Sequence, residues 1–158
     1  MSDDISYAEL QEFVGAFWHH YDEAHFDQLA IQLDDDIRYT SRSDTGASAF
    51  EEMLKADLRG RDATLAWLST HRKESPYPLR HNSSNLFRVG VVDGITSASF
   101  YIFVTQITNS VPFAVSSGVV TVSVARRDGE LRFTSMHAVL DTQESVPYAT
   151  RASDRVNS

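Results

Sequence analysis

The change from a helical to a strand-like hydrophobic pattern along the chain is the feature that most restricts its fold. Residues 5–33 carry apolar side chains at three- and four-residue steps, with a break between Asp22 and His25, which is typical of helices with one buried face. The second half instead contains four strand-like segments: 79–92, 95–108, 118–127 and 131–140. Asp93–Gly94 and Asp128–Gly129 are hairpin signals between them. Helices first and an antiparallel meander second predict an α+β fold.

The middle of the chain has weaker patterns. Residues 37–40 alternate enough to predict a short strand after an acidic turn, and residues 41–46 read as a polar loop. A second helical zone covers about residues 47–71, with Gly60 as an interruption and Asp62 as a plausible N-cap. We find no linker or repeat, so residues 1–141 are predicted to form a single domain, followed by a polar C-terminal tail over 142–158.

The composition excludes several classes of protein. The chain has 158 residues, of which 42% are hydrophobic and 23% are charged, as in ordinary globular domains. It has no cysteine, which rules out disulfides and thiolate metal ligands and fits a reducing compartment. The formal net charge of −8 argues against a nucleic-acid partner. Because no leader pattern and no membrane-length apolar run is present, we predict no membrane contact and a cytoplasmic location.

The run Arg80–Asn85 carries the clearest chemical signal. His81 opens an otherwise apolar strand in polar company, and it is either satisfied by its neighbours or a general base in a pocket. Asp22 ends the first apolar helix, where the helix dipole disfavours an acid, so it is a candidate for orienting an imidazole. Tyr39 is either a core aromatic or a hydroxyl that donates to a substrate carbonyl oxygen.

The remaining histidines give a mixed prediction. His137 is predicted to share a face of the last strand with Phe133 and Ser135, and it joins a pocket if that face is concave and is a surface residue otherwise. His19, His20 and His25 are five and six residues apart across the predicted helix break, without a matched carboxylate pattern. Metal sites on helices favour spacings that place ligands on one face, so we predict no metal site there.

The order of elements and several short motifs resemble the SnoaL-like branch of the nuclear transport factor two-like superfamily across residues 5–141. The segment Tyr21–Leu29 looks like the helix-break segment of scytalone dehydratase, and Asp36–Tyr39 looks like the strand that follows it. Arg80–His81 falls where that family places its catalytic histidine, and the surrounding run is also similar to β subunits of ring-hydroxylating dioxygenases. The resemblance implies a cone-shaped, strongly curved antiparallel sheet, covered by N-terminal helices that close a deep pocket.

The resemblance also implies roles for individual residues. Asp22 would orient His81, His81 would remove a proton next to a carbonyl, and the Tyr21 and Tyr39 hydroxyls would stabilise the enolate. Other residues expected to line the pocket are Trp18, Asn85 and His137. The dehydratase family has a second active-site histidine on the third sheet strand, and residues 116–121 contain none.

Two functions of different classes follow from this resemblance. The first is a lyase or isomerase (dehydratase, isomerase or cyclase) that needs no cofactor and acts on a small carbonyl, aromatic or polycyclic substrate as a homo-oligomer. The second is a non-catalytic β subunit of a ring-hydroxylating dioxygenase, or a ligand-binding module with the same fold. Fold alone does not choose between them. The enzyme hypothesis requires Asp22 and His81 within hydrogen-bond reach in one pocket, whereas the subunit hypothesis predicts that a competent pocket is missing.

Overall fold

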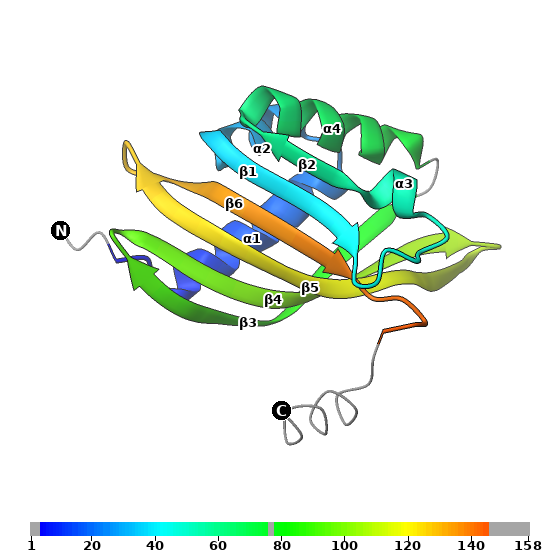
Figure 1. Cartoon of the computed structure of the whole chain (residues 1–158). Helices are drawn as coiled ribbons and strands as arrows, with labels where there is room; N and C mark the ends of the chain where they lie inside the picture. Colours follow the sequence, from blue (N-terminus) through cyan, green and yellow to red (C-terminus); the bar gives the residue numbers. More distant parts are fainter. Residues whose placement is uncertain (1–3, 76–77, 146–158) are drawn as a thin grey trace, which may run out of the picture.

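The computed structural model of the protein describes residues 4–75 and 78–145. In chain order the elements are α1 (Tyr7–Asp22), α2 (Phe26–Gln32), β1 (Leu33–Ser43), α3 (Glu51–Leu54), β2 (Ala56–Arg59), α4 (Arg61–Glu74), β3 (Leu79–Val92), β4 (Ile95–Thr108), β5 (Val111–Arg127) and β6 (Glu130–Leu140). Among the described residues the strands form one sheet in the order β2-β1-β6-β5-β4-β3, which leaves β2 and β3 as its edges. Figure 1 shows a curved sheet with the helices gathered on one side, so the predicted α+β class is confirmed.

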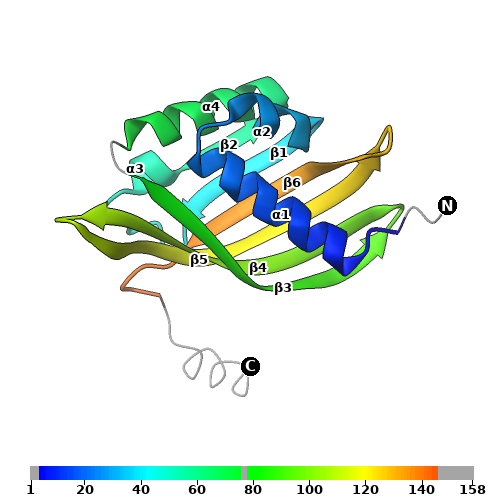
Figure 2. The same cartoon turned by 180° about the vertical axis from the view of Figure 1, so that it is seen from behind.

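Helix α1 lies across the concave face of the sheet, as Figure 2 shows. Its start is fixed by a capping box, in which the Ser6 hydroxyl accepts from the Glu9 backbone N–H and the Glu9 carboxylate accepts from the Ser6 N–H. The residues of α1 that face the sheet are buried: Leu10, Val14, Phe17, Trp18, Tyr21 and Asp22. The last three of these bring an indole, a phenol and a carboxylate beneath the helix, at the end of the stripe that forms the core.

The antiparallel meander of β3, β4 and β5 supplies most of the sheet. In β4, the inward residues Ala98, Phe100 and Ile102 are buried. Tyr101 and Phe103, which alternate with them, point outward and are exposed. The predicted turns are present, and both residues of each Asp-Gly pair have positive φ, as two-residue hairpins of type I′ require. The alternation therefore sets which side chains can reach the space under the helices.

Three features of the sheet differ from the sequence-based expectation. Strand β1 runs parallel to β6, so the sheet is mixed rather than wholly antiparallel. A short strand, β2, lies within the predicted second helical zone, and α4 starts at a cap formed by Gly60 (φ 89°) rather than by Asp62. Strands β1 and β5 are also longer than predicted, because pairing with β6 continues through the polar end of β1 to Ser43 and pairing with β4 begins at Val111 of β5. Of the predicted tail, residues 142–145 are described and the remainder lies outside the described residues.

A β-bulge in β6 changes which of its residues face the core. Phe133 pairs with Val124 and Ser135 pairs with Ser123, so Thr134 is an additional residue in β6. Phe133 and Met136 consequently both point inward, where they are almost fully buried. The prediction that His137 shares a face with Phe133 is therefore wrong.

Among the described residues, no helix combines the length and the apolarity needed to cross a membrane.

Candidate functional site

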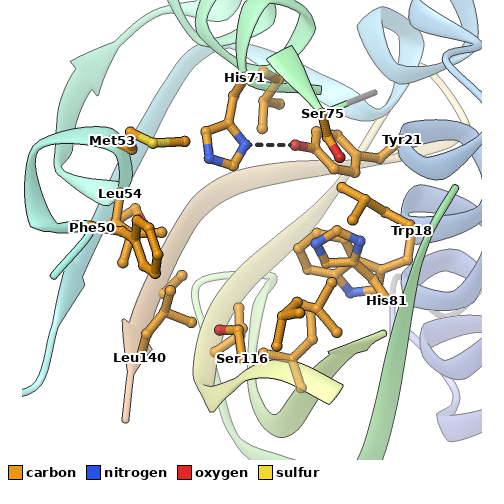
Figure 3. Close-up of a pocket in the computed structure, with 18 of the residues that line it drawn as sticks. Trp18, Tyr21, Phe50, Met53, Leu54, His71, Ser75, His81, Ser116 and Leu140 are labelled. Atoms are coloured by element: carbon orange, nitrogen blue, oxygen red, sulfur yellow. Dashed lines mark hydrogen bonds between the residues drawn. The ribbon is translucent and has the colours of Figure 1, made fainter. Parts of the chain in front are cut away.

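A cavity of about 460 Å³ is lined by residues of helices α1, α3 and α4 and by the inward side chains of the sheet. Such a volume is within the range of ~300–1,000 Å³ that is typical of small-molecule sites. Most of the lining is aromatic or aliphatic, and a few polar groups project into it (Figure 3). The aromatic and titratable residues of the lining are Trp18, Tyr21, Tyr39, Phe50, Trp67, His71, Glu74, His81 and Asp141.

His81 and Asp22 form a buried pair in this cavity. The ring Nδ1 of His81 lies 2.6 Å from Asp22 Oδ1, and the backbone N–H of His81 donates to the other carboxylate oxygen at 2.7 Å. The exposed fraction of each side chain is small, 11% for His81 and 6% for Asp22. Both carboxylate oxygens thus hold the same residue, so Asp22 fixes the position of the strand as well as the orientation of the ring.

Two basic residues hold the end of α1 that carries this carboxylate. Arg72 of α4 donates through Nε to the backbone carbonyl of Asp22 at 2.9 Å. Arg80 of β3 forms an ion pair with Glu23, the C-cap of α1, with an N–O distance of 3.1 Å. These contacts connect α1 to α4 on one side and to β3 on the other, which limits the movement of Asp22 relative to His81.

The imidazole of His81 is further held by aromatic contacts. It stacks on the Trp18 indole with 4.7 Å between ring centroids and 5° between planes, and it meets the Tyr21 ring edge-on at 5.0 Å. Within the described residues, only Asp22 bonds to the ring nitrogens of His81. An Nδ1–H that donates to the carboxylate leaves Nε2 of the neutral ring as a lone pair, which is the arrangement of an oriented general base.

A second histidine, His71 of α4, lines the same cavity. Figure 3 shows the Tyr21 hydroxyl directed at this ring, with 2.8 Å between the Tyr21 oxygen and His71 Nδ1. The ring of His71 stacks on Trp67, with centroids 4.7 Å apart and 12° between the planes. His71 and His81 are therefore each held by a tryptophan and by one hydrogen-bonding partner, from opposite walls of the cavity.

The surroundings of His71 determine where its proton lies. Burial lowers the pKa of His71 below its ordinary value, and the positive charge that His81 carries when it is protonated acts in the same direction. Burial raises the pKa of the Tyr21 phenol far above its ordinary value, so the hydroxyl keeps its proton. If the phenol donates to Nδ1 of the neutral imidazole, the proton of that imidazole is on Nε2. In this tautomer His71 offers an N–H donor to the cavity, whereas a His81 ring that donates from Nδ1 to Asp22 offers a lone pair.

Tyr39 of β1 contributes a further hydroxyl to the cavity. It is 6% exposed and lines the cavity beside Trp67, with 5.3 Å between the ring centroids. Burial raises the pKa of its hydroxyl, and a hydrogen bond with the Ser41 side chain lowers it in part. The hydroxyl is therefore a donor over the whole physiological pH range.

The structure brings most of the predicted residues together, with two exceptions. Trp18, Tyr21, Tyr39 and His81 line the cavity, and Asp22 supports His81 from behind. His137 does not line it, because the bulge at Thr134 turns its side chain to the outer face of the sheet, where it contacts Thr40 at 2.7 Å. Asn85 does not line it either.

The position of Asn85 has a local cause. It is exposed and has a φ of 56°, within a register shift of β3 against β4 between Ser84 and Phe87. A left-handed residue at a bulge directs its side chain away from the regular alternation. The predicted role of Tyr21 towards a substrate stays a prediction, and the structure adds that its hydroxyl is hydrogen-bonded to His71.

His71 is a cavity residue that sequence reasoning missed. Its signal was present, because Trp67 and His71 are four residues apart and therefore share one face of α4 with Leu68 and Thr64, which are buried. A polar ring at that spacing on an inward face needs a partner. Tyr21, which supplies it, is fifty residues away in the sequence.

Histidines also gather at the turn that follows α1, outside the cavity. Within the described part of the chain, the group of three or more potential metal ligands is His19, His20 and His25, whose ligand atoms lie within 4.8 Å of one another. The prediction of no metal site assumed that the sequence spacing keeps these three rings apart, and the structure shows that they lie close together.

Comparisons with known proteins identify the fold. No family model matches the sequence, and no curated protein matches it significantly. An NTF2-like protein with a cystatin-like fold from Novosphingobium aromaticivorans superposes with a TM-score of 0.69 at 17% identity, covering 92% of this chain and 86% of that chain. The predicted resemblance to the nuclear transport factor two-like superfamily is thereby confirmed as a shared fold.

Two further similar structures are a protein bound to a small molecule and a subunit of a larger enzyme. A protein from Catenulispora acidiphila in complex with S-DNPA has 21% identity and a TM-score of 0.70, with 94% of this chain and 96% of that chain covered. The β subunit of the benzoate 1,2-dioxygenase from Burkholderia mallei has 15% identity and a TM-score of 0.71, with 94% and 98% covered. At these identities the likeness shows the fold, and function has to be argued from the site.

Proposed function

We propose that this protein is an enzyme that, without a cofactor, moves a proton next to the carbonyl group of a small aromatic or polycyclic molecule. The observation that carries the proposal is the buried Asp22–His81 pair, which holds Nε2 of His81 as a lone pair in a cavity of about 460 Å³. A base fixed in this way at a mostly apolar surface is suited to removing a carbon-bound proton. The complex of the Catenulispora acidiphila protein with S-DNPA supports a small-molecule role for such a cavity.

The first step follows from the two histidines. Nε2 of His81 takes the proton from the carbon next to the carbonyl, and the electron pair of the C–H bond moves to form the enolate. The enolate oxygen accepts a hydrogen bond from Nε2–H of His71 and from the Tyr39 hydroxyl. The imidazolium that forms on His81 is stabilised by Asp22, which lies 2.6 Å from its Nδ1. Stabilisation by a neutral imidazole avoids placing a buried positive charge on His71.

The second step returns the proton from the His81 imidazolium. If the enolate carbon further along a conjugated system takes it, the reaction is an isomerisation. If a hydroxyl on the neighbouring carbon takes it as the C–O bond breaks, water leaves and the reaction is a dehydration. If the enolate carbon attacks a second carbonyl of the same molecule, the new alkoxide takes the proton and the reaction is a cyclisation. One base that returns the proton it removed serves all three.

A non-catalytic role is the second candidate. The likeness to a β subunit of benzoate 1,2-dioxygenase, at a TM-score of 0.71, favours it. That role requires no competent pocket, and an aligned acid–histidine pair beneath a cavity is more than a supporting subunit needs. Purification of the isolated chain distinguishes the two candidates. A non-catalytic subunit should be stable only in complex with a larger iron-containing partner, whereas the enzyme should be stable as purified.

The outer face of the sheet supports self-association, which we propose as part of the functional state. Among its exposed apolar residues are Phe87 on β3, Tyr101 and Phe103 on β4, and Val119 on β5. Strand pairing places Tyr101 beside Val119, so the patch is continuous. A second copy is the proposed cover for this face. Light scattering should give a dimer mass or larger for the native chain and a monomer mass for F103E.

Deuterium exchange tests the proposed chemistry without knowledge of the natural substrate. The protein is incubated in D₂O with a panel of aromatic and polycyclic ketones, and incorporation at the carbon next to the carbonyl is followed by mass spectrometry. We expect catalysed exchange for ligands that fit the cavity and its loss in H81Q. H137Q is the matched control, because His137 lies on the outer face. Exchange that persists in H81Q would contradict the proposal, and so would the absence of exchange for every ketone that binds.

A further inference from the structure

The turn after α1 places three histidines together on the outside of the molecule. Ala24 has a left-handed backbone with a φ of 59°. The N–H of Ala24 donates to the Tyr21 carbonyl, and the N–H of His25 donates to the His20 carbonyl at 2.8 Å. This is the Schellman arrangement of a helix end, which brings the side chain two positions beyond the C-cap against the side chain in the last helical turn. Here those two positions hold His25 and His20, where an apolar contact is usual.

The distances between the rings fit the ligation of a metal ion. His20 Nδ1 and His25 Nδ1 are 3.3 Å apart. Two nitrogens bound tetrahedrally at the zinc–nitrogen distance of ~2.0–2.1 Å lie about 3.3–3.4 Å from each other. His19 stands next to both, with its ring centroid 5.5 Å from that of His20 and 5.8 Å from that of His25. The ligand atoms of all three lie within 4.8 Å of one another.

The cluster is accessible from solvent. His19 and His25 are exposed and His20 is partly buried, so an ion and a water molecule can reach the three rings. The nearby Glu23 carboxylate forms an ion pair with Arg80. A metal ion binds imidazoles in their neutral form, so protons compete with it for the three rings.

We propose that His19, His20 and His25 form a binding site for a divalent transition-metal ion of the zinc class, with water in the remaining position. Nitrogen-only ligands of this type suit zinc, copper and nickel and do not suit magnesium or calcium. His20 and His25 already have the required spacing, so His19 is the ligand that has to move closer. An ion bound here connects the last turn of α1 to the start of α2, next to the residues that hold Asp22. The site is independent of the proposed reaction, since none of its ligands lines the cavity.

Isothermal titration of the full chain, without a polyhistidine tag, with zinc chloride tests the site. We expect the native chain to bind one Zn²⁺ and to melt at a higher temperature when it is bound. Loss of even a second-shell partner weakens metal binding by about 10–100-fold, so H19Q and H25Q should each weaken it by about tenfold or more. Both positions are exposed, so these variants should fold normally. H137Q is the control and should bind like the native chain.

Several outcomes would overturn the site. The absence of binding in the native chain would show that the 3.3 Å contact is a hydrogen bond between the His20 and His25 rings. Binding that is lost in H25Q and kept in H19Q would show a pair of ligands rather than three. Binding weakened equally in H137Q would show unspecific association with histidines. Deuterium exchange by the metal-free chain is unaffected by any of these results, so failure of the metal site and failure of the proposed reaction can be distinguished.

Discussion

His81 and His71 occupy opposite walls of one cavity and are held in nearly the same way, except for one partner. Each imidazole stacks on a tryptophan with 4.7 Å between ring centroids, His81 on Trp18 and His71 on Trp67. Asp22 accepts a hydrogen bond from Nδ1 of His81, whereas Nδ1 of His71 contacts the Tyr21 hydroxyl, to which we assign the donor role. With these partners, an acceptor behind the ring makes the far nitrogen of His81 a base, and a donor behind the ring makes the far nitrogen of His71 an N–H donor.

The same difference explains why adjacent residues of α1 have separate duties. Tyr21 and Asp22 follow one another in the last turn, and each serves a different histidine. Because both are held on one rigid helix end, the base and the donor keep a fixed distance across the cavity. Each of the following variants removes one part of this arrangement.

D22N should have the largest effect. The amide keeps the shape of the carboxylate, but it can donate to Nδ1 of His81 and so place the histidine proton on Nε2. Loss of a carboxylate behind a catalytic histidine costs about 10⁴-fold in the serine protease case, so we expect a decrease of roughly 10³–10⁴-fold in the rate of deuterium exchange. Circular dichroism controls for the fold. A rate within about tenfold of the native rate would contradict the role of Asp22.

H71L should have the next largest effect. Removal of a single hydrogen-bond donor from a developing oxyanion costs about 10²–10³-fold, and the exchange rate should decrease by that amount. H71Q, whose amide N–H can occupy part of the position of Nε2–H, should recover some of the loss. If H71L and H71Q are equally slow, packing of the ring on Trp67 rather than donation is its contribution.

Y21F should have a smaller effect, because Tyr21 acts only through His71. The hydrogen bond between them contributes a net free energy of about 0.5–1.5 kcal/mol, which corresponds to a decrease of roughly 2–10-fold in the exchange rate. In the H71L background the same substitution should change nothing further. A large additional decrease in the double variant would mean that Tyr21 touches the substrate itself.

The smallest expected effect is a difference between the native chain and H71Q in how the free energy of unfolding depends on pH. Burial lowers the pKa of His71, so the unfolded chain takes up this proton at a higher pH than the folded chain does. His71 therefore destabilises the fold as the pH decreases below the ordinary histidine value of 6.5 towards the lowered one, and it has no such effect above 6.5. H71Q should lose less stability than the native chain between neutral and mildly acid pH in urea unfolding.

The sequence predicted the part of the site that depends on local patterns. Asp22 stood out as an acid at a helix end and His81 as a polar residue opening an apolar strand, and the structure joins them. His71 was not predicted because its duty depends on Tyr21, which tertiary packing brings to it. His137 was misplaced because the bulge at Thr134 reverses the alternation, and a single additional residue leaves no mark in the hydrophobic pattern.

The histidine cluster after α1 was misjudged for a similar reason. A separation of five residues places two side chains on different faces of a straight helix, but the left-handed Ala24 turns the chain back. Glycine at that position would have signalled the turn, and alanine hides it. In the same way, the strand β2 was hidden within a helical zone, because only its pairing with β1 makes four residues a strand. Local sequence therefore does not specify features that depend on one distant contact or one unusual φ.

The two imidazoles of the cavity are proposed to carry their protons on opposite ring nitrogens. Nitrogen-15 NMR of the histidine side chains measures this directly at neutral pH, with H71Q and H81Q to assign the signals. We expect a proton on Nδ1 of His81 with a free lone pair on Nε2, and a proton on Nε2 of His71 with Nδ1 accepting from Tyr21. Protons on the same nitrogen of both rings would contradict it.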